Sequence, residues 1–376
     1  MYEQQIQEDI LFFMLYAAVT MLSLIACCYL MFRKGNAFAP DITTPPRLRR
    51  WTIAFLAIMT LGHLWYLPSY FLPPGNEQLM CKLLGGLFDC LTTIPFAIAI
   101  LFTMLQDRKR SLWPIAVMMA PLVAGMVICI ATFNTDIMPM LLLYIQVVGI
   151  GLIIYMVHEV IRYGRWLRDN YADLEHKEMW QSFVALTVIL VAFGIYVGGL
   201  RWPAYEVIIQ VCDIIIICFI LWRVETLSDL SSPQALSDTE EEDTESSEAM
   251  ENGGLSQHIQ DKIGLLLQKH CIDTQLYLQH DLTLMQLAKA VGTNRYYLSL
   301  YFSCQGITYN AYINNLRINH FVEIYRKAVA SHRPFTAQQL AHDSGYRSYS
   351  TFSLAFKQRM GESVSGWVKK ATSLQS

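Results

Sequence analysis

Seven long apolar runs constrain the fold of this chain more than any other feature. A helix needs roughly 20 apolar residues to cross a bilayer, and each run approaches or exceeds that length. Apolar residues make up 54% of the 376 residues and charged residues only 16%, more apolar than ordinary soluble proteins. The sequence therefore predicts seven membrane-spanning helices, at about residues 10–32, 51–72, 83–105, 112–133, 137–157, 180–200 and 204–222.

The basic residues between these runs predict an orientation. Alternate connections differ sharply, because twelve Lys and Arg residues fall in the first, third and fifth connections, whereas only Lys82 and Arg201 occupy the others. Short connections rich in Lys and Arg stay on the cytoplasmic side. We therefore expect the N-terminus outside and, after seven crossings, the C-terminus in the cytoplasm. The twelve are Arg33, Lys34, Arg47, Arg49, Arg50, Arg108, Lys109, Arg110, Arg162, Arg165, Arg168 and Lys177.

Four ionisable residues lie within or beside the predicted spans: His63, Asp89, Glu206 and Asp213. Charge inside a bilayer is costly, so such residues often mark function. Counting along the helices places Asp89 and Asp213 at similar depth below the outer surface. One hypothesis is an outward-facing polar pocket that receives a small-molecule or envelope signal; the alternatives are polar contacts between helices and charges at helix ends.

The sixth predicted span contains two glycines, Gly194 and Gly198, at a spacing that lets helices approach closely. This pattern is consistent with a homodimer contact and also with packing inside one bundle.

An acidic segment follows the last span. Residues 228–256 carry nine acidic residues and no Lys or Arg, and they are rich in serine. Such a composition buries too little apolar surface to fold, so we expect a disordered linker. It is either a solvated spacer or an acidic block that covers the basic region after it.

Residues 257–376 contain one short pattern twice. The copies begin at Thr283 and Thr336, each followed by Gln three residues later, and the interval between these threonines equals that between Gly292 and Gly345. Thr-x-x-Gln is a capping box that starts a helix, and glycine suits the tight turn that ends one. A second amphipathic stretch follows each glycine, so the pattern predicts two helix-turn-helix units.

The region carries 13 Lys and Arg against six Asp and Glu, a balance expected of a nucleic-acid binder. Its motifs resemble the DNA-binding domain of the AraC family of bacterial transcription regulators, over roughly residues 257–370. Val364 stands where the family usually has proline, and Leu300 and Leu354 stand where many members have a base-reading arginine. The matching residues are Leu287, Ala288, Gly292, Leu298, Phe302, Gly306, Tyr312, Leu316, Arg317, Leu340, Ala341, Gly345, Tyr346, Ser350, Phe352, Phe356, Lys357, Gly361 and Trp367.

This resemblance implies two recognition helices, at about residues 294–302 and 348–356, joined by a connecting helix at about 309–329. Leu298, Phe302, Phe352 and Phe356 are expected in the core. Arg317, Lys357 and Arg359 are expected to contact phosphates or to serve structure. The side chains expected to face DNA are Asn294, Arg295, Tyr296, Ser299, Arg347, Ser348, Tyr349, Ser350 and Ser353.

The sequence thus predicts an all-α protein with three parts: a seven-helix membrane region (1–227), an acidic linker (228–256) and an AraC-like DNA-binding domain (257–376). We expect a transcription regulator in the bacterial inner membrane, with double-stranded DNA and the lipid bilayer as partners. Neither a catalytic or metal-binding motif nor a cofactor is indicated. The alternatives are a heptahelical receptor or transporter whose C-terminal module binds a protein, and a membrane enzyme built on His63, Asp89 and Asp213.

Overall fold

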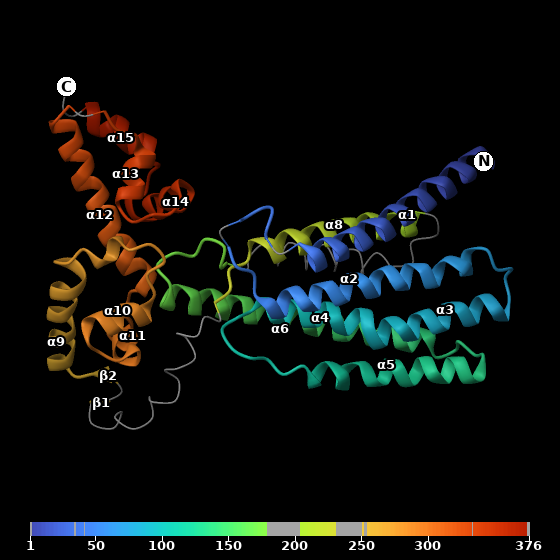
Figure 1. Ribbon diagram of the computed structural model, residues 1–376. Coiled ribbons are helices and arrows are strands. Elements are labelled where there is room, and N and C mark those ends of the chain that lie inside the picture. The colour runs from blue at the N-terminus through green and yellow to red at the C-terminus, as the bar shows by residue number, and fades with distance from the viewer. Residues whose placement is uncertain are drawn as a thin grey trace. The chain divides into compact units, whose positions relative to one another are not determined.

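The computed structural model describes residues 2–33, 35–40, 42–178, 204–230, 250–251, 254–332 and 334–373, and it divides into two compact units (Figure 1). Unit 1 comprises Met1–Tyr163 and Met179–Leu236, and unit 2 comprises Gly164–Glu178 and Ser237–Ser376. The predicted span at 180–200, with Gly194 and Gly198, lies outside the described residues, as does most of the acidic linker.

Unit 1 is built of long apolar helices. Six helical segments among the described residues are long and apolar enough to cross a membrane; the seventh predicted span falls in the undescribed stretch. The third segment contains a π-helical turn, Asp89–Thr93, between α3 and α4. The helices are α1 (Tyr2–Phe32), α2 (Pro46–Tyr66), the 3₁₀ turn η1 (Leu67–Tyr70), α3 (Asn76–Phe88), α4 (Ile94–Met104), α5 (Trp113–Thr132), α6 (Met138–Asn170) and α8 (Ala204–Thr226).

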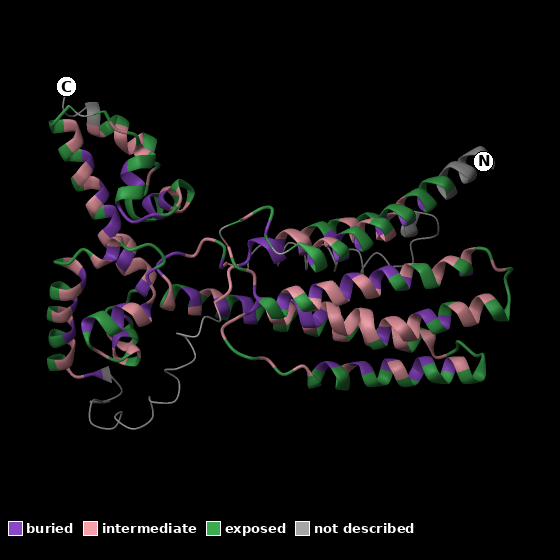
Figure 2. Ribbon diagram, in the orientation of Figure 1, coloured by how far each residue is buried: buried purple, intermediate pink, exposed green. Residues whose placement is uncertain are grey.

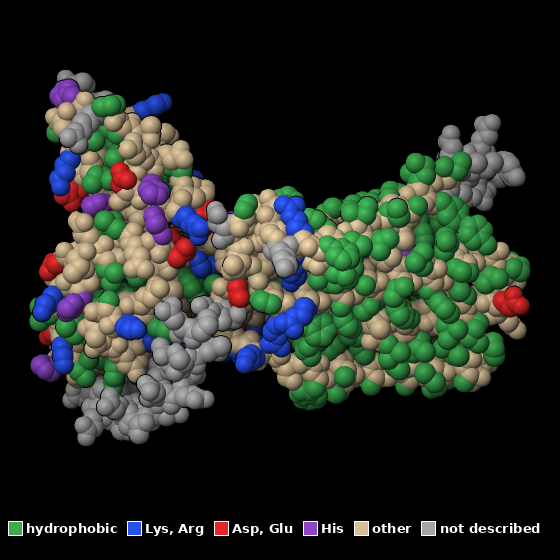
Figure 3. All heavy atoms as spheres, viewed as in Figure 1, with side chains coloured by type: hydrophobic (Ala, Val, Ile, Leu, Met, Phe, Trp, Pro, Cys, Tyr) green, Lys and Arg blue, Asp and Glu red, His purple; other side chains and the backbone are tan. Residues whose placement is uncertain are grey.

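Alternate connections of unit 1 meet at one end of the bundle. The connection after α1 contacts the end of α8, because Asn36 Nδ2 donates to the carbonyl of Glu225 at 3.1 Å. The connection after α4 contacts the same region through Gln106, whose Nε2 donates to the carbonyl of Ser228 at 2.8 Å. Arg108 Nη2 reaches Glu159 of α6 at 2.8 Å. The basic connections therefore share one end, and Figure 3 shows Lys and Arg side chains gathered there.

Apolar side chains cover much of the surface of unit 1 (Figure 3). On α6, Leu143, Val147, Ile150 and Ile154 are all exposed, and their spacing of three or four residues puts them on one helix face. Buried, intermediate and exposed positions alternate along these helices (Figure 2). An exposed apolar face of this length is costly in water but suits the hydrocarbon of a bilayer.

The described residues of unit 2 are mainly helical, with one short antiparallel pair, β1 (Met250–Glu251) and β2 (Gly254–Leu255). Its long helix α12 links two cores. Ile313 belongs to the core of the first helix-turn-helix unit, and Ile318 and Phe321 belong to the core of the second. The elements are α9 (Gln257–Leu267), the π turn η4 (Gln268–Ile272), the 3₁₀ turn η5 (Leu276–Leu278), α10 (Leu284–Val291), α11 (Arg295–Cys304), α12 (Tyr309–Ala330), α13 (Ala337–Asp343), α14 (Tyr349–Met360) and α15 (Val364–Ser373).

Candidate DNA-binding surface

The first helix-turn-helix unit forms as its sequence predicts. Thr283 accepts the backbone N–H of Gln286, and the Gln286 side chain accepts the N–H of Thr283, which completes the capping box at the start of α10. Gly292 ends this helix in the left-handed conformation, with φ 73°. Helix α11 starts three residues later, at Arg295, and Asn294 caps it by accepting the N–H of Tyr296 at 2.7 Å.

The second unit repeats this arrangement with two differences: its capping box lacks the second hydrogen bond, and its glycine has no room for a Cβ atom. Thr336 accepts the N–H of Gln339 at the start of α13, but the structure gives no reciprocal bond here. Gly345 has φ 88°, and a Cβ added to it would lie 2.8 Å from the carbonyl oxygen of Leu278. Glycine is therefore required at this turn for both conformation and space. Ser348 caps α14 by accepting the N–H of Thr351.

The predicted core residues of both recognition helices are confirmed. Leu298 and Phe302 are buried in the first core, and Phe352 and Phe356 are fully buried in the second. These core contacts fix which face of each recognition helix points inward.

The residues predicted to face DNA in α11 lie on its accessible side. Asn294, Tyr296 and Ser299 are exposed, and Arg295 is half-buried. Asn294 also serves as the helix cap, so its side-chain oxygen is already engaged by the backbone.

The corresponding residues of α14 are also accessible. Arg347, Tyr349 and Ser350 are exposed, and Ser348 and Ser353 are half-buried. Together with the α11 set, they give each helix-turn-helix unit one polar face of the kind that contacts base edges and phosphates.

The two leucines at the family's arginine positions have different environments. Leu300 packs partly buried against the first core, whereas Leu354 is 58% exposed on α14. Leu354 therefore presents an apolar side chain at a position where many members of the AraC family have a base-reading arginine.

Arg317 is a structural residue, which resolves the two roles that the sequence left open. Its side chain is fully buried, and its guanidinium donates to the carbonyls of Tyr277 at 2.7 Å and Gln279 at 2.8 Å. Its Nη1 also pairs with Asp173 Oδ1 at 2.9 Å. A side chain held in this way is inaccessible to a DNA phosphate. Lys357 and Arg359, in contrast, are exposed.

Asp173 belongs to a segment that sequence reasoning did not connect with this domain. Residues 171–178 follow α6 and pack within unit 2. Tyr171 forms a β-bridge with Thr283, the N–H of Ala172 donates to the carbonyl of Leu282 at 3.1 Å, and Ala172 is buried in the first core. Only the acidic residues of this segment, set against a basic domain, hinted at the contact.

Asp281 lies in an ionic cluster beside this segment. Lys177 Nζ is 3.1 Å from its Oδ1, and Arg347 Nη1 is 3.2 Å from its Oδ2. Burial alone would raise the pKa of Asp281, but the charges of Lys177 and Arg347 hold that pKa below its ordinary value.

Three of the four predicted intramembrane residues converge in unit 1. His63 Nε2 lies 3.9 Å from Asp213 Oδ2, and Asp89 interacts electrostatically with both residues. Asp89 also accepts hydrogen bonds from Tyr66 at 2.8 Å and Thr93 at 2.9 Å. The side chain of Glu206 lies outside the described residues.

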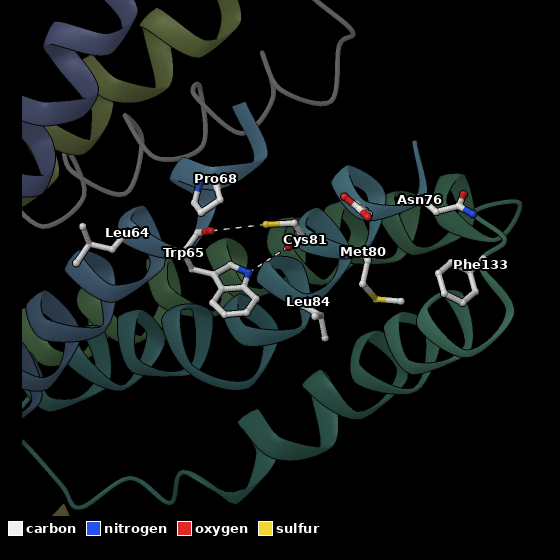
Figure 4. Close-up of a pocket in the computed structure, with 9 residues that line it drawn as sticks. Leu64, Trp65, Pro68, Asn76, Met80, Cys81, Leu84 and Phe133 are labelled. Carbon is white, nitrogen blue, oxygen red and sulfur yellow. Dashed lines mark hydrogen bonds between the residues drawn. The ribbon is translucent and has the colours of Figure 1, made fainter. Parts of the chain in front are cut away.

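A separate apolar pocket of about 690 Å³ opens between α2 and α3 (Figure 4). Its wall is held by Trp65, whose Nε1 donates to the carbonyl of Cys81 at 3.1 Å. None of the four predicted signal residues lines it. Within the described residues, no group of three or more His, Cys, Asp or Glu side chains is placed to hold a metal ion.

Comparison with known proteins assigns a class to the C-terminal domain. A family described as "Helix-turn-helix domain" matches residues 287–370, and this domain is of the AraC type. The match covers less than half of the chain and supports a DNA-binding transcription regulator, with a regulatory rather than a catalytic C-terminal domain. Comparison of the chain with curated proteins and with solved structures gave no match.

Proposed function

We propose that the protein is a membrane-bound, sequence-specific transcription regulator that couples a signal at the bacterial envelope to gene expression. The observation that carries this proposal is that the described residues of one chain include six long apolar helical segments and a tandem helix-turn-helix domain whose recognition helices carry accessible polar residues.

The apolar helices support a place in the inner membrane. The exposed apolar stripe on α6 needs a lipid or protein cover, and the basic connections meet at one end of unit 1. With a seventh span at 180–200, the positive-inside rule puts the N-terminus outside and the DNA-binding domain in the cytoplasm.

The signal-receiving site in this proposal is the polar cluster of His63, Asp89 and Asp213, with Glu206 on the same helix as Asp213. Ionisable groups at these depths are expensive unless they pair or bind a ligand. Asp89→Asn and Asp213→Asn should each alter the response of a target promoter to the signal, and a wild-type response in both would remove the cluster from the proposal.

The DNA contacts divide by chemistry. Phosphate contacts from the basic domain supply most of the affinity and make it salt-dependent. Arg295 and Arg347, at the starts of the two recognition helices, together with the neighbouring Asn, Ser and Tyr side chains, are the proposed contacts to base edges.

The test uses the full-length protein in lipid nanodiscs. A pool of genomic duplex fragments is selected on the protein at low salt, and the bound fragments are sequenced. We expect enrichment of a motif with two elements about 10 base pairs apart, the spacing of one helical turn. Binding should fall at least tenfold between about 50 and 200 mM salt if several phosphates are contacted.

A matched pair of variants locates the surface. Arg347→Ala should weaken binding of the enriched duplex by roughly tenfold, as loss of a charged contact does. Lys327→Ala removes the same charge from α12, where Lys327 pairs with Glu323, and should change binding by less than twofold. Equal effects of the two substitutions, or no enrichment at all, would contradict the proposed surface.

A further inference from the structure

The last residue of α6 and the segment that follows it contact the starts of both recognition helices. On α11, the guanidinium of Arg295 donates to Asn170 Oδ1 through Nε at 3.2 Å and Nη2 at 2.6 Å. On α14, Glu175 Oε2 accepts hydrogen bonds from Ser348 at 2.5 Å and from Thr351 at 2.8 Å. We define residues 170–177 as the clasp.

The contacts of Asn170 and Glu175 engage side chains that are proposed to bind DNA. Arg295 and Ser348 are among the residues that the sequence predicts to face DNA. The start of a helix attracts anions through its free N–H groups and its dipole. A carboxylate placed there, bound by two hydroxyls, occupies the position that favours a DNA phosphate.

The clasp is held firmly between these two contacts. Asp173 pairs with the buried Arg317 and also accepts the N–H of Asp281 at 2.9 Å. Asn310 Nδ2 donates to the carbonyl of Ala172 at 2.6 Å. Asp173 therefore acts as a fixed point, while Asn170 and Glu175 reach the recognition helices from either side of it.

We propose that the clasp is an intrachain competitor of DNA: Asn170 and Glu175 must leave Arg295, Ser348 and Thr351 before both recognition helices can bind. Helix α6 runs without a break from Met138 to Asn170, so a rotation or shift of this helix moves Asn170 directly. A signal received by the membrane helices would reach the DNA-binding surface through this helix. This inference rests on the proposed function, because it requires that the domain bind DNA.

The experiment measures binding of the enriched duplex to full-length protein in nanodiscs. Glu175→Ala removes both hydrogen bonds to α14 and should tighten binding by roughly three- to tenfold, since opening the clasp no longer breaks a charged contact. Glu323→Ala removes a carboxylate from the exposed surface of α12, where it pairs with Lys327, and should change binding by less than twofold. Glu175→Gln keeps the shape, loses the charge and should give a smaller gain.

The reverse substitution tests the other contact. Asn170→Asp places a carboxylate against Arg295 and should weaken binding by roughly threefold or more. Binding by Glu175→Ala and Glu175→Gln that equals or falls below the wild type, with melting unchanged, would overturn the clasp while leaving DNA binding intact. A failure of every variant to bind any duplex would instead overturn the proposed function, and the inference with it.

Discussion

The buried ion pair between Arg317 and Asp173 offers the sharpest test of how unit 2 is held together. Both side chains are almost completely buried, at 0% and 5% exposure, and their charged atoms are 2.9 Å apart. The perturbation is Asp173→Asn, which keeps the size of the side chain and removes its charge. Arg317 would then remain charged in a dry environment without a carboxylate.

The expected cost follows from these contacts. Removing one partner of a buried ion pair typically costs about 3–5 kcal/mol. Arg317 keeps two backbone carbonyls as acceptors, and the new amide oxygen can still accept one hydrogen bond. We therefore expect a loss of about 2–4 kcal/mol in the free energy of unfolding of unit 2. For a unit of this size, the midpoint of melting should fall by roughly 5–12 °C.

The assay is thermal proteolysis of the full-length protein in nanodiscs, read through a tag at the C-terminus. The control is Asp273→Asn, the same chemical change at an exposed carboxylate that accepts a bond from Gln268 at 2.7 Å; it should shift the midpoint by less than 2 °C, because isolated surface contacts contribute little. In the double variant Arg317→Met/Asp173→Asn the buried charge is gone, so the loss should be less than the sum of the single losses by about 1–3 kcal/mol. A midpoint for Asp173→Asn within 1 °C of the wild type would refute the reasoning.

Three further predictions concern the same domain. Phe321→Ala should cost about 3–5 kcal/mol in urea unfolding of unit 2, because this fully buried ring is in contact with four other aromatic rings of the second core. Gly345→Ala should cost roughly 2–4 kcal/mol, since its φ is 88° and an added Cβ meets a backbone carbonyl; Gly292→Ala, with φ 73° and open space, should cost only about 1 kcal/mol in the same assay. The pKa of Asp281 is lowered in the folded protein. Its ionised form therefore contributes its full stabilisation when the pH is above the ordinary aspartate pKa of about 4. This stabilisation is lost as the pH falls through the lower folded-state pKa. Melting of the wild type and of Asp281→Asn, measured from pH 6 down to pH 2.5, should therefore converge at the acid end; a constant gap would contradict this.

Local signals in the sequence were enough to predict much of unit 2. The capping box at Thr283 and the glycine at position 292 act within a few residues, and Leu298 and Phe302 follow the helical period. Each of these features depends only on residues close in the sequence, which is why the sequence alone could predict it. The structure confirms the capping box and the burial of Leu298 and Phe302. Counting along the helices predicted only that Asp89 and Asp213 lie at similar depth. The structure places His63 3.9 Å from Asp213, and the signal role of the cluster stays a prediction.

The clasp could not be predicted in this way. Tyr171 and Ala172 contact the domain through backbone hydrogen bonds. Every residue has these backbone groups, so no sequence motif indicates such a contact. The role of Arg317 was ambiguous for a related reason. A basic residue in a basic domain suggests a phosphate contact, whereas its burial is explained by an ion pair with Asp173, which is distant in the sequence. Helix α6 ends at Asn170, and the residues after it contact the recognition helices.

The pairing of Arg317 with Asp173 has a practical consequence for anyone who isolates the regulator's C-terminal domain. The carboxylate comes from a part of the chain separated from the domain by residues 179–236, so a soluble fragment cut at the acidic linker leaves its central guanidinium without a counter-ion. Such a fragment is expected to be less stable than the same residues in the intact protein. A synthetic peptide of residues 164–178, added in trans, would return the missing charge.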